Sequence, residues 1–231
     1  MDKFAYELLD NPIWNALQTK HQAYATGTPV IKRYPREMLP FLACQNPAAS
    51  KLNDIEPWLA TDEKLFIVGE IPPLPSNWML TKQLDCVQMV CEDQKNIFRQ
   101  DVHITRISGT ENDELIQLID MVQPGYFFKD TILSGRYFGI KEEKKLVAVA
   151  GERLRIPGFT EISAVCTHPS FRGKGYAQML VTHLIRLNHQ EGTIPFLHVL
   201  ENNTLAINIY TLLGFRKRIM MPFQQLRLNT H

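Results

Sequence analysis

The segment 165–177 constrains this chain more than any other part of the sequence. It reads Val-Cys-Thr-His-Pro-Ser-Phe-Arg-Gly-Lys-Gly-Tyr-Ala, an apolar strand that enters a glycine-rich basic turn and then an amphipathic helix. Gly173 and Gly175 allow backbone conformations that are closed to other residues, so successive N–H groups can converge on one point. The N-terminus of the helix directs further free N–H groups to that point. The turn therefore predicts a pyrophosphate-binding site, to which Arg172 and Lys174 add charge.

Two common phosphate-binding motifs do not fit this turn. A P-loop needs a longer glycine spacing that ends in Lys-Ser or Lys-Thr, whereas Tyr176 and Ala177 follow here. A dinucleotide-binding fingerprint needs a further glycine and an acidic residue about 20 positions later at a strand end. This chain offers only Glu191, which lies in a predicted turn. The pattern that fits is Arg-x-x-Gly-x-Ala, in which Arg172 and Gly175 precede Ala177.

A second motif follows after one more predicted strand. Residues 203–215 read Asn-x-x-Ala-x-x-x-Tyr-x-x-x-Gly-Phe, with Asn203 and Tyr210 at two of the fixed positions. The two motifs, in this order, resemble the acyl-coenzyme A site of the GNAT superfamily of N-acetyltransferases. The resemblance covers residues 100–230. The chain is also similar in layout to two-part relatives of the glycine N-acyltransferase type, which have a degenerate N-terminal half.

The order of the predicted elements agrees with this resemblance. Apolar runs and alternating patterns predict strands, and apolar residues at helical spacing predict helices. The run 146–150 is apolar on both faces, so we expect its strand to be central in a sheet. The resemblance implies an α/β fold, the GNAT fold, with a mixed, mostly antiparallel central sheet flanked by helices. Strands are predicted at 102–106, 137–140, 146–153, 160–167, 196–200, 215–221 and 224–228, and helices at 112–121, 175–188 and 204–213.

Polar residues at 92–96 divide the sequence into two unequal parts. We predict an N-terminal α/β region over 1–95 and an acyl-coenzyme A-binding catalytic domain over 96–231. The first part contains predicted strands at 65–68 and 87–91 but no second glycine turn. By analogy with two-part relatives, this region is expected to shape the acceptor pocket or to have a structural role.

Composition narrows the class of protein. The formal net charge is +1, so no overall field favours binding to nucleic acid or to an anionic membrane. The four cysteines show neither a disulfide pattern nor zinc-ligand spacing. No run approaches the roughly 20 apolar residues that span a bilayer, and no signal-peptide run is seen. We therefore expect a cytoplasmic protein, a monomer or homodimer, that binds no metal, nucleic acid or membrane.

The resemblance implies acetyl-coenzyme A, or another acyl-coenzyme A, as co-substrate. Backbone groups of Val165 and Thr167 are expected to pair with the pantetheine arm, in a slot that opens toward the strand at 197–200. An N–H group there could polarise the thioester carbonyl. Asn203 corresponds to an asparagine that contacts the pantetheine region in the family, and it could equally be a helix N-cap. The residues expected to bind the coenzyme are Val165, Cys166, Thr167, Arg172, Gly173, Lys174, Gly175, Tyr176, Ala177 and Asn203.

Tyr210 and Glu161 are the candidate catalytic residues. By resemblance, Tyr210 protonates the departing thiolate, because a phenol with a pKa near 10 can donate a hydrogen bond to it. The alternative is a tyrosine that only packs its ring in the core.

Glu161 is the candidate general base, because its spacing from Arg172 resembles that of the base in the histone-acetylating branch. By strand alternation Glu161 shares a face with Ser163, Val165 and Thr167, and a carboxylate beside a cleft could have a raised pKa. Glu152 and a water relay are the alternatives. Either glutamate could instead be a solvated strand charge.

The acceptor site is the least defined part of the sequence. Residues 124–128, Pro-Gly-Tyr-Phe-Phe, correspond to a wall that faces the acceptor amine in relatives, although they could equally be core. His168 and His198 occupy no position that the family uses in catalysis. The sequence therefore predicts an N-acetyltransferase that transfers an acetyl or acyl group from acetyl-coenzyme A to a primary amine of a small molecule or amino acid, by direct attack in a ternary complex. The alternative is a non-catalytic acyl-coenzyme A sensor or regulatory module.

Overall fold

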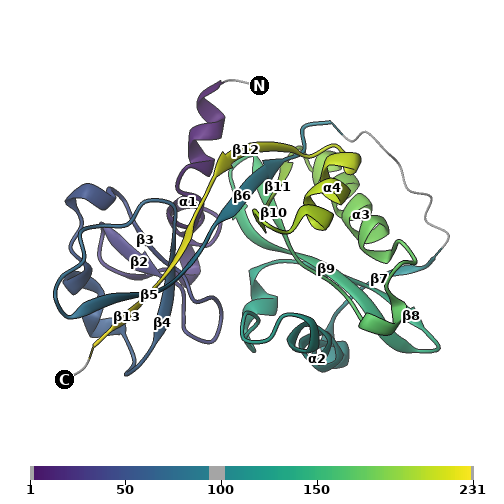
Figure 1. Ribbon diagram of the computed structural model, residues 1–231, viewed down its shortest axis with the longest axis horizontal. Helices are drawn as coiled ribbons and strands as arrows, with labels where there is room; N and C mark the ends of the chain where they lie inside the picture. Colours follow the sequence, from purple (N-terminus) through teal and green to yellow (C-terminus); the bar gives the residue numbers. More distant parts are fainter. Residues whose placement is uncertain (1–2, 94–101, 230–231) are drawn as a thin grey trace.

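The computed structural model describes residues 3–93 and 102–229, which form two lobes (Figure 1). The larger lobe is built on a seven-stranded sheet. Neighbouring strands in it are antiparallel except for one parallel pair, β10 with β11, so the expected mixed, mostly antiparallel sheet is confirmed. Across the sheet the strands are β12 (Arg216–Met220), β6 (Cys86–Val90), β11 (Ile194–Leu200), β10 (Phe159–Thr167), β9 (Lys145–Ile156), β8 (Tyr137–Glu142) and β7 (Ile104–Arg106).

Helices cover both faces of the seven-stranded sheet. α3 (Tyr176–Gln190) and α4 (Thr204–Leu213) pack on one face, in the same cluster as Phe138. α2 (Asn112–Val122) packs on the opposite face, in the same cluster as Tyr137. Neighbouring side chains of β8 therefore point into different layers, as expected for a strand buried on both sides. None of the helices in residues 3–93 and 102–229 is long and apolar enough to cross a membrane.

The smaller lobe contains two three-stranded sheets and α1 (Pro12–Gln18). α1 covers the α2 side of the large sheet, because Leu9 and Ile13 belong to one core cluster with Phe159 and Phe196. One small sheet has the order β1 (Thr26–Gly27), β2 (Ile31–Arg33) and β3 (Leu42–Cys44), and the other has β4 (Lys64–Val68), β13 (Phe223–Leu228) and β5 (Trp78–Leu84). Short 3-10 helices lie at Lys3–Leu9, Gln22–Tyr24, Pro47–Ala49, Leu52–Trp58, Gly109–Glu111, Thr131–Ser134 and Pro169–Phe171.

Two strands cross between the lobes. β6 comes early in the chain, yet it lies in the large sheet between β11 and β12. β13 comes last, yet it is the middle strand of the small sheet with β4 and β5, as Figure 1 shows. The chain therefore contributes its N-terminal part to the large sheet and its C-terminal part to the small one. The boundary predicted between residues 95 and 96 lies outside the described residues and stays a prediction.

A bulge interrupts the pairing of β10 with β9. Between Ser163 and Cys166, β10 has one residue more than its partner, and Ala164 there has a positive φ of 52°. An extra residue reverses the alternation of side chains beyond it. Val165 therefore packs in the layer of α3 and α4, whereas Glu161 points into the opposite layer. The sequence predicted that Val165 shares a face of β10 with Glu161. This prediction is wrong, because the bulge after Ser163 turns Val165 to the other face.

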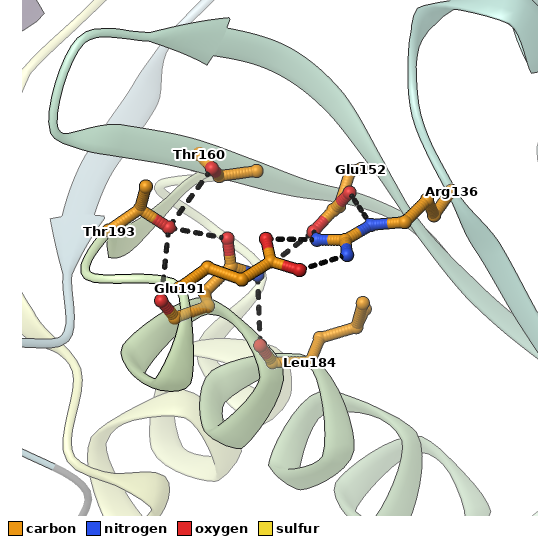
Figure 2. Close-up of polar contacts among 7 residues, drawn as sticks. Arg136, Glu152, Thr160, Leu184, Glu191 and Thr193 are labelled. Atoms are coloured by element: carbon orange, nitrogen blue, oxygen red, sulfur yellow. Dashed lines mark hydrogen bonds and ion pairs between the residues drawn. The ribbon is translucent and has the colours of Figure 1, made fainter.

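A buried ion-pair network ties the end of α3 to the large sheet (Figure 2). Glu152 on β9 is fully buried, and Arg136 donates to both of its carboxylate oxygens at 2.7 Å. Asn188 of α3 donates to the same carboxylate at 3.0 Å. Thr193 donates to the side-chain oxygen of Asn188 at 2.8 Å, and Arg136 also donates to Glu191 at 2.9 Å. Glu152 thus serves as the attachment point of α3 on β9.

We predict that Arg136→Met destabilises the fold by about 3–5 kcal/mol, because it leaves a buried carboxylate without its cationic partner. Urea unfolding followed by circular dichroism measures the change. Arg155→Met is the matched control, since Arg155 lies exposed on β9. A loss below about 1 kcal/mol for Arg136→Met would show that Glu152 does not depend on this pair.

Candidate active site

The parallel strands β10 and β11 part in the middle of the large sheet. They pair only from Phe159 with Ile194 to Glu161 with Phe196. Beyond these residues β10 continues along β9, and β11 continues along β6. The expected slot between the two strands is therefore confirmed.

The gap opens into a cavity of about 450 Å³. Ser163, Ala164 and Val165 of the bulge line one side, and residues 197–200 of β11 line the other. Asn203 and Tyr210, at the start and near the end of α4, also line it. Residues of the smaller lobe also line the cavity, together with Cys86 at the start of β6: Leu39, Pro40, Phe41, Phe66, Lys82, Leu84 and Phe223.

The glycine turn at the end of β10 is open. Gly173 and Gly175 have φ values of 81° and 79°, in the region that favours glycine. A Cβ added at Gly173 would meet nothing within 4 Å, and one at Gly175 would meet only the Met179 methyl at 3.8 Å. Gly175 is the N-cap of α3 and supplies no side-chain cap, so the first-turn N–H groups stay available. The turn can therefore receive an anion through its main chain.

The charged and aromatic side chains of the turn have other contacts. Lys174 lies 5.0 Å from the centre of the Phe171 ring, and its Nζ is 3.6 Å from Glu142. Tyr176 is buried and its hydroxyl donates to Glu142. Tyr176 can therefore offer an anion its main-chain N–H but not its hydroxyl.

The three residues of β10 that were predicted to bind the coenzyme lie in different surroundings. Val165 lines the cavity. Cys166 is buried under α2, and burial raises the pKa of its thiol to about 12, so it remains a thiol. Thr167 pairs with Ala148 of β9 and is not among the lining residues. Only Val165 of these three therefore borders the cavity.

Tyr210 and Asn203 face the cavity from α4. Burial raises the pKa of Tyr210 to about 12, so the phenol keeps its proton, and its ring packs edge-on against Phe215. The Asn203 side-chain oxygen accepts from Ala206 N–H at 3.1 Å and caps the helix. Its amide NH₂ group is not used in that bond. Asn203 therefore both caps α4 and lines the cavity.

Glu161 is fully buried and does not line the cavity. Arg153 donates to both of its carboxylate oxygens, at 2.8 and 2.6 Å, and His198 donates to one of them at 2.7 Å. Burial opposes ionisation of Glu161, but the charge and hydrogen bonds of Arg153 and His198 outweigh it and lower its pKa to about 2. The expected raised pKa is therefore wrong.

The hydrogen bonds fix the tautomer of His198. Arg218 donates to the side-chain oxygen of Gln88 at 2.9 Å, and a guanidinium can only donate. The Gln88 amide nitrogen therefore faces His198 Nε2, at 3.1 Å, and Nε2 accepts. The proton of His198 is thus on Nδ1, where it is donated to Glu161. Neither ring nitrogen is free for an acceptor in the cavity.

Arg153 is a cavity residue that the sequence patterns did not indicate. Between Thr160 and Ile162 the register with β9 shifts by one residue, so Arg153 stands beside Glu161. Its guanidinium lies 5.0 Å from the centre of the Phe41 ring and 6.0 Å from that of Phe223. β9 also carries Glu152 and Arg155 beyond its apolar run 146–150, so the strand pattern did not single out Arg153.

The predicted acceptor wall at 124–128 borders the cavity through Tyr126 and Phe127. The Tyr126 hydroxyl accepts from Lys82 Nζ at 3.0 Å. Tyr126 also borders a second cavity of about 380 Å³, which Arg36, Asp62, Glu63 and Lys64 line as well. Among the described residues that line the first cavity, Lys82 and Arg153 carry charge and none is Asp or Glu.

Glu152 and His168 do not line either cavity. Glu152 is held by Arg136 and Asn188, as described above. His168 Nδ1 accepts from Ser170 N–H at 3.2 Å at the start of the glycine turn. These two residues therefore shape the elements around the site.

Known proteins similar to this chain share its fold. Residues 137–227 match the FR47-like protein family. A solved structure from Novosphingobium aromaticivorans, assigned to the GNAT acetyltransferases, is 27% identical, covers 96% of this chain and 99% of its own, and has a TM-score of 0.88. No curated protein matches this chain.

Two more distant structures show the fold alone. A GCN5-related N-acetyltransferase from Kribbella flavida is 14% identical over 98% of this chain and 96% of its own, with a TM-score of 0.65. A GCN5-related N-acetyltransferase-like protein from Streptococcus suis is 14% identical over 98% of this chain and 97% of its own, with a TM-score of 0.54. The chain therefore has the GNAT fold. The match to the FR47-like family and the 27% identical structure from Novosphingobium aromaticivorans support an acetyltransferase of the GNAT family.

Proposed function

We propose that this protein transfers an acetyl or longer acyl group from acyl-coenzyme A to the primary amine of a small molecule, by direct attack in a ternary complex. One observation carries the proposal. The gap between β10 and β11 opens into a cavity that Tyr210 lines, and β10 itself ends at the open glycine turn. Coenzyme and acceptor could therefore meet in one space.

The coenzyme is proposed to bind along β10. Its pyrophosphate would contact the main-chain N–H groups at Gly175 and the first turn of α3, where the helix dipole also favours negative charge. Its pantetheine arm would lie in the gap beside Val165, with Asn203 near it. A main-chain N–H of the bulge would then polarise the thioester carbonyl.

The departing thiolate is proposed to accept a hydrogen bond from Tyr210. The Tyr210 hydroxyl has no hydrogen-bond partner among the described residues, and its raised pKa keeps it protonated at neutral pH. A protonated phenol beside the sulfur stabilises negative charge that develops as the C–S bond breaks.

The acceptor amine is proposed to lose its proton to water, with Glu161 positioning Arg153 rather than acting as the base. A carboxylate whose pKa is about 2 is a weak proton acceptor, and Glu161 does not border the cavity. The positive charge of Lys82, which lines the cavity, favours the neutral amine over the ammonium ion. Proton loss to water was one of the alternatives to Glu161 that the sequence left open.

A non-catalytic sensor is the second candidate, favoured by the lack of Asp or Glu among the described lining residues. Release of free thiol from acetyl-coenzyme A, measured with a panel of amines, separates the two functions. Thiol release that depends on an amine supports transfer. Tight coenzyme binding without release for any amine supports the sensor.

Gly175→Asp is predicted to weaken coenzyme A binding at least about tenfold, because a carboxylate would stand against the pyrophosphate. Gly175→Asn is the matched control, since it has the same shape and the same backbone strain without the charge. Calorimetric titration measures both affinities. Equal affinities for the two variants would remove the turn from the binding site.

Tyr210→Phe is predicted to lower kcat about 100-fold and to leave the Kd for coenzyme A unchanged. The ring would still pack against Phe215, so the thermal midpoint should not move. Steady-state kinetics and calorimetry together give the two values. A fully active variant would limit Tyr210 to a packing role.

The pH profile of kcat/KM is predicted to follow the acceptor, because no enzyme group with a pKa near neutrality is proposed as base. The rate should rise with pH through the pKa of the amine, and Tyr210, still protonated, should cause no fall up to about pH 10. Two amines of different pKa should give two different inflections. One shared inflection that disappears in Glu161→Gln would make Glu161 the base.

A further inference from the structure

The cavity presents a positively charged group to its contents, held in place by a buried carboxylate. Arg153 uses Nε and Nη2 to bind Glu161, and its side chain is 20% exposed and lines the cavity. An arginine has five N–H donors arranged as a fork. No acceptor among the described residues takes the two donors on Nη1. One edge of the guanidinium is thus fixed and another edge is open to a ligand.

The aromatic rings on either side of Arg153 restrict its motion. Phe41 and Phe223 lie at 5.0 and 6.0 Å from the guanidinium carbon. Phe41 comes from the smaller lobe, and Phe223 begins β13. A guanidinium held by a carboxylate and two rings loses little entropy when a second anion binds.

The charges around the cavity leave one positive charge uncompensated. The charge of Arg153 is balanced by Glu161. Lys82 also lines the cavity, and its one hydrogen-bond partner within residues 3–93 and 102–229 is the Tyr126 hydroxyl. His198 accepts at Nε2 and donates at Nδ1, so its ring is neutral. A ligand with one negative charge therefore matches the cavity.

Apolar side chains make up much of the remaining wall, beside polar ones such as Gln123, Thr131 and Asn203. Leu39, Phe66, Phe127 and Tyr137 line the cavity together with the two rings that flank Arg153. Such a wall favours an apolar body on the ligand, since burying it removes apolar surface from water. The bulge and Tyr210, where the proposed transfer takes place, line the same cavity.

We infer that Arg153, assisted by Lys82, forms a carboxylate-binding subsite and that the acceptor is an amine that also carries a carboxylate and an apolar body. The inference rests on the proposed function and names its acceptor class. The carboxylate would bind the open edge of Arg153, and the amino group would then point toward the bulge. Arg153 is in this view the residue that determines acceptor specificity.

Matched acceptor pairs test the chemical class. Thiol release is measured with phenylalanine against phenethylamine, leucine against 3-methylbutylamine, and glycine against methylamine. We expect kcat/KM at least about tenfold higher for the acid in one or more pairs, the range expected for hydrogen bonds to a charged group. Equal or higher values for the decarboxylated amine in every pair would overturn the inference.

Variants test the residue. Arg153→Lys keeps the positive charge beside Glu161 but loses the open edge of the fork, and it should raise KM for the preferred acid about tenfold without changing KM for its decarboxylated partner. Lys82→Met, at an exposed position on β5, should act in the same direction by about threefold. Arg155→Met, exposed on β9, is the control that should change neither value. Equal effects of Arg153→Lys on acid and amine would assign Arg153 a structural role.

Binding measured without turnover separates this inference from the proposed function. Calorimetric titration of the coenzyme A-loaded protein with phenylalanine and with phenethylamine should show preference for the acid, lost in Arg153→Lys. If no amine releases thiol but this preference is present, the proposed transfer fails and the subsite stands. If amines release thiol and no preference for acids is found, the transfer stands and the subsite fails.

Discussion

The side-chain contact between Glu161 and His198 joins β10 and β11 where their backbones part. The last backbone pair is Glu161 with Phe196, and the 2.7 Å hydrogen bond from His198 lies immediately beyond it. A buried carboxylate is costly unless it is paired, and Arg153 supplies the pair. The opening of the sheet and the cation in the cavity therefore depend on one buried group.

The local parts of the site could be predicted from the sequence, and the long-range parts could not. The glycine turn and the capped helix α4 are set by residues close in the chain, so their patterns predict them directly. The position of β6 between β11 and β12 depends on pairing between strands far apart in the sequence. The place of β13 in the small sheet also depends on pairing with distant strands, β4 and β5, and the residue pattern within β13 does not predict these partners.

The environment of Glu161 shows why its chemistry could not be read from its position on a strand. Burial alone would raise the pKa of a carboxylate, and an adjacent guanidinium lowers it, so the outcome depends on which group stands beside it. That neighbour is Arg153 because the register of β9 shifts by one residue at this point. One extra residue in β9 thus makes Glu161 the buried partner of Arg153 rather than a candidate base.

The walls of the cavity divide according to their origin in the chain. The groups proposed to contact the coenzyme lie on β10, α3 and α4. All three elements fall within residues 137–227, which match the FR47-like protein family. Phe41, Phe66 and Lys82 come from the smaller lobe, and Phe223 joins them because β13 crosses to that lobe. Changes in these residues could alter the acceptor while leaving the glycine turn untouched. The interweaving of the two lobes holds this wall against the parted strands, so the proposed acceptor site and the proposed coenzyme site can change separately and still adjoin each other.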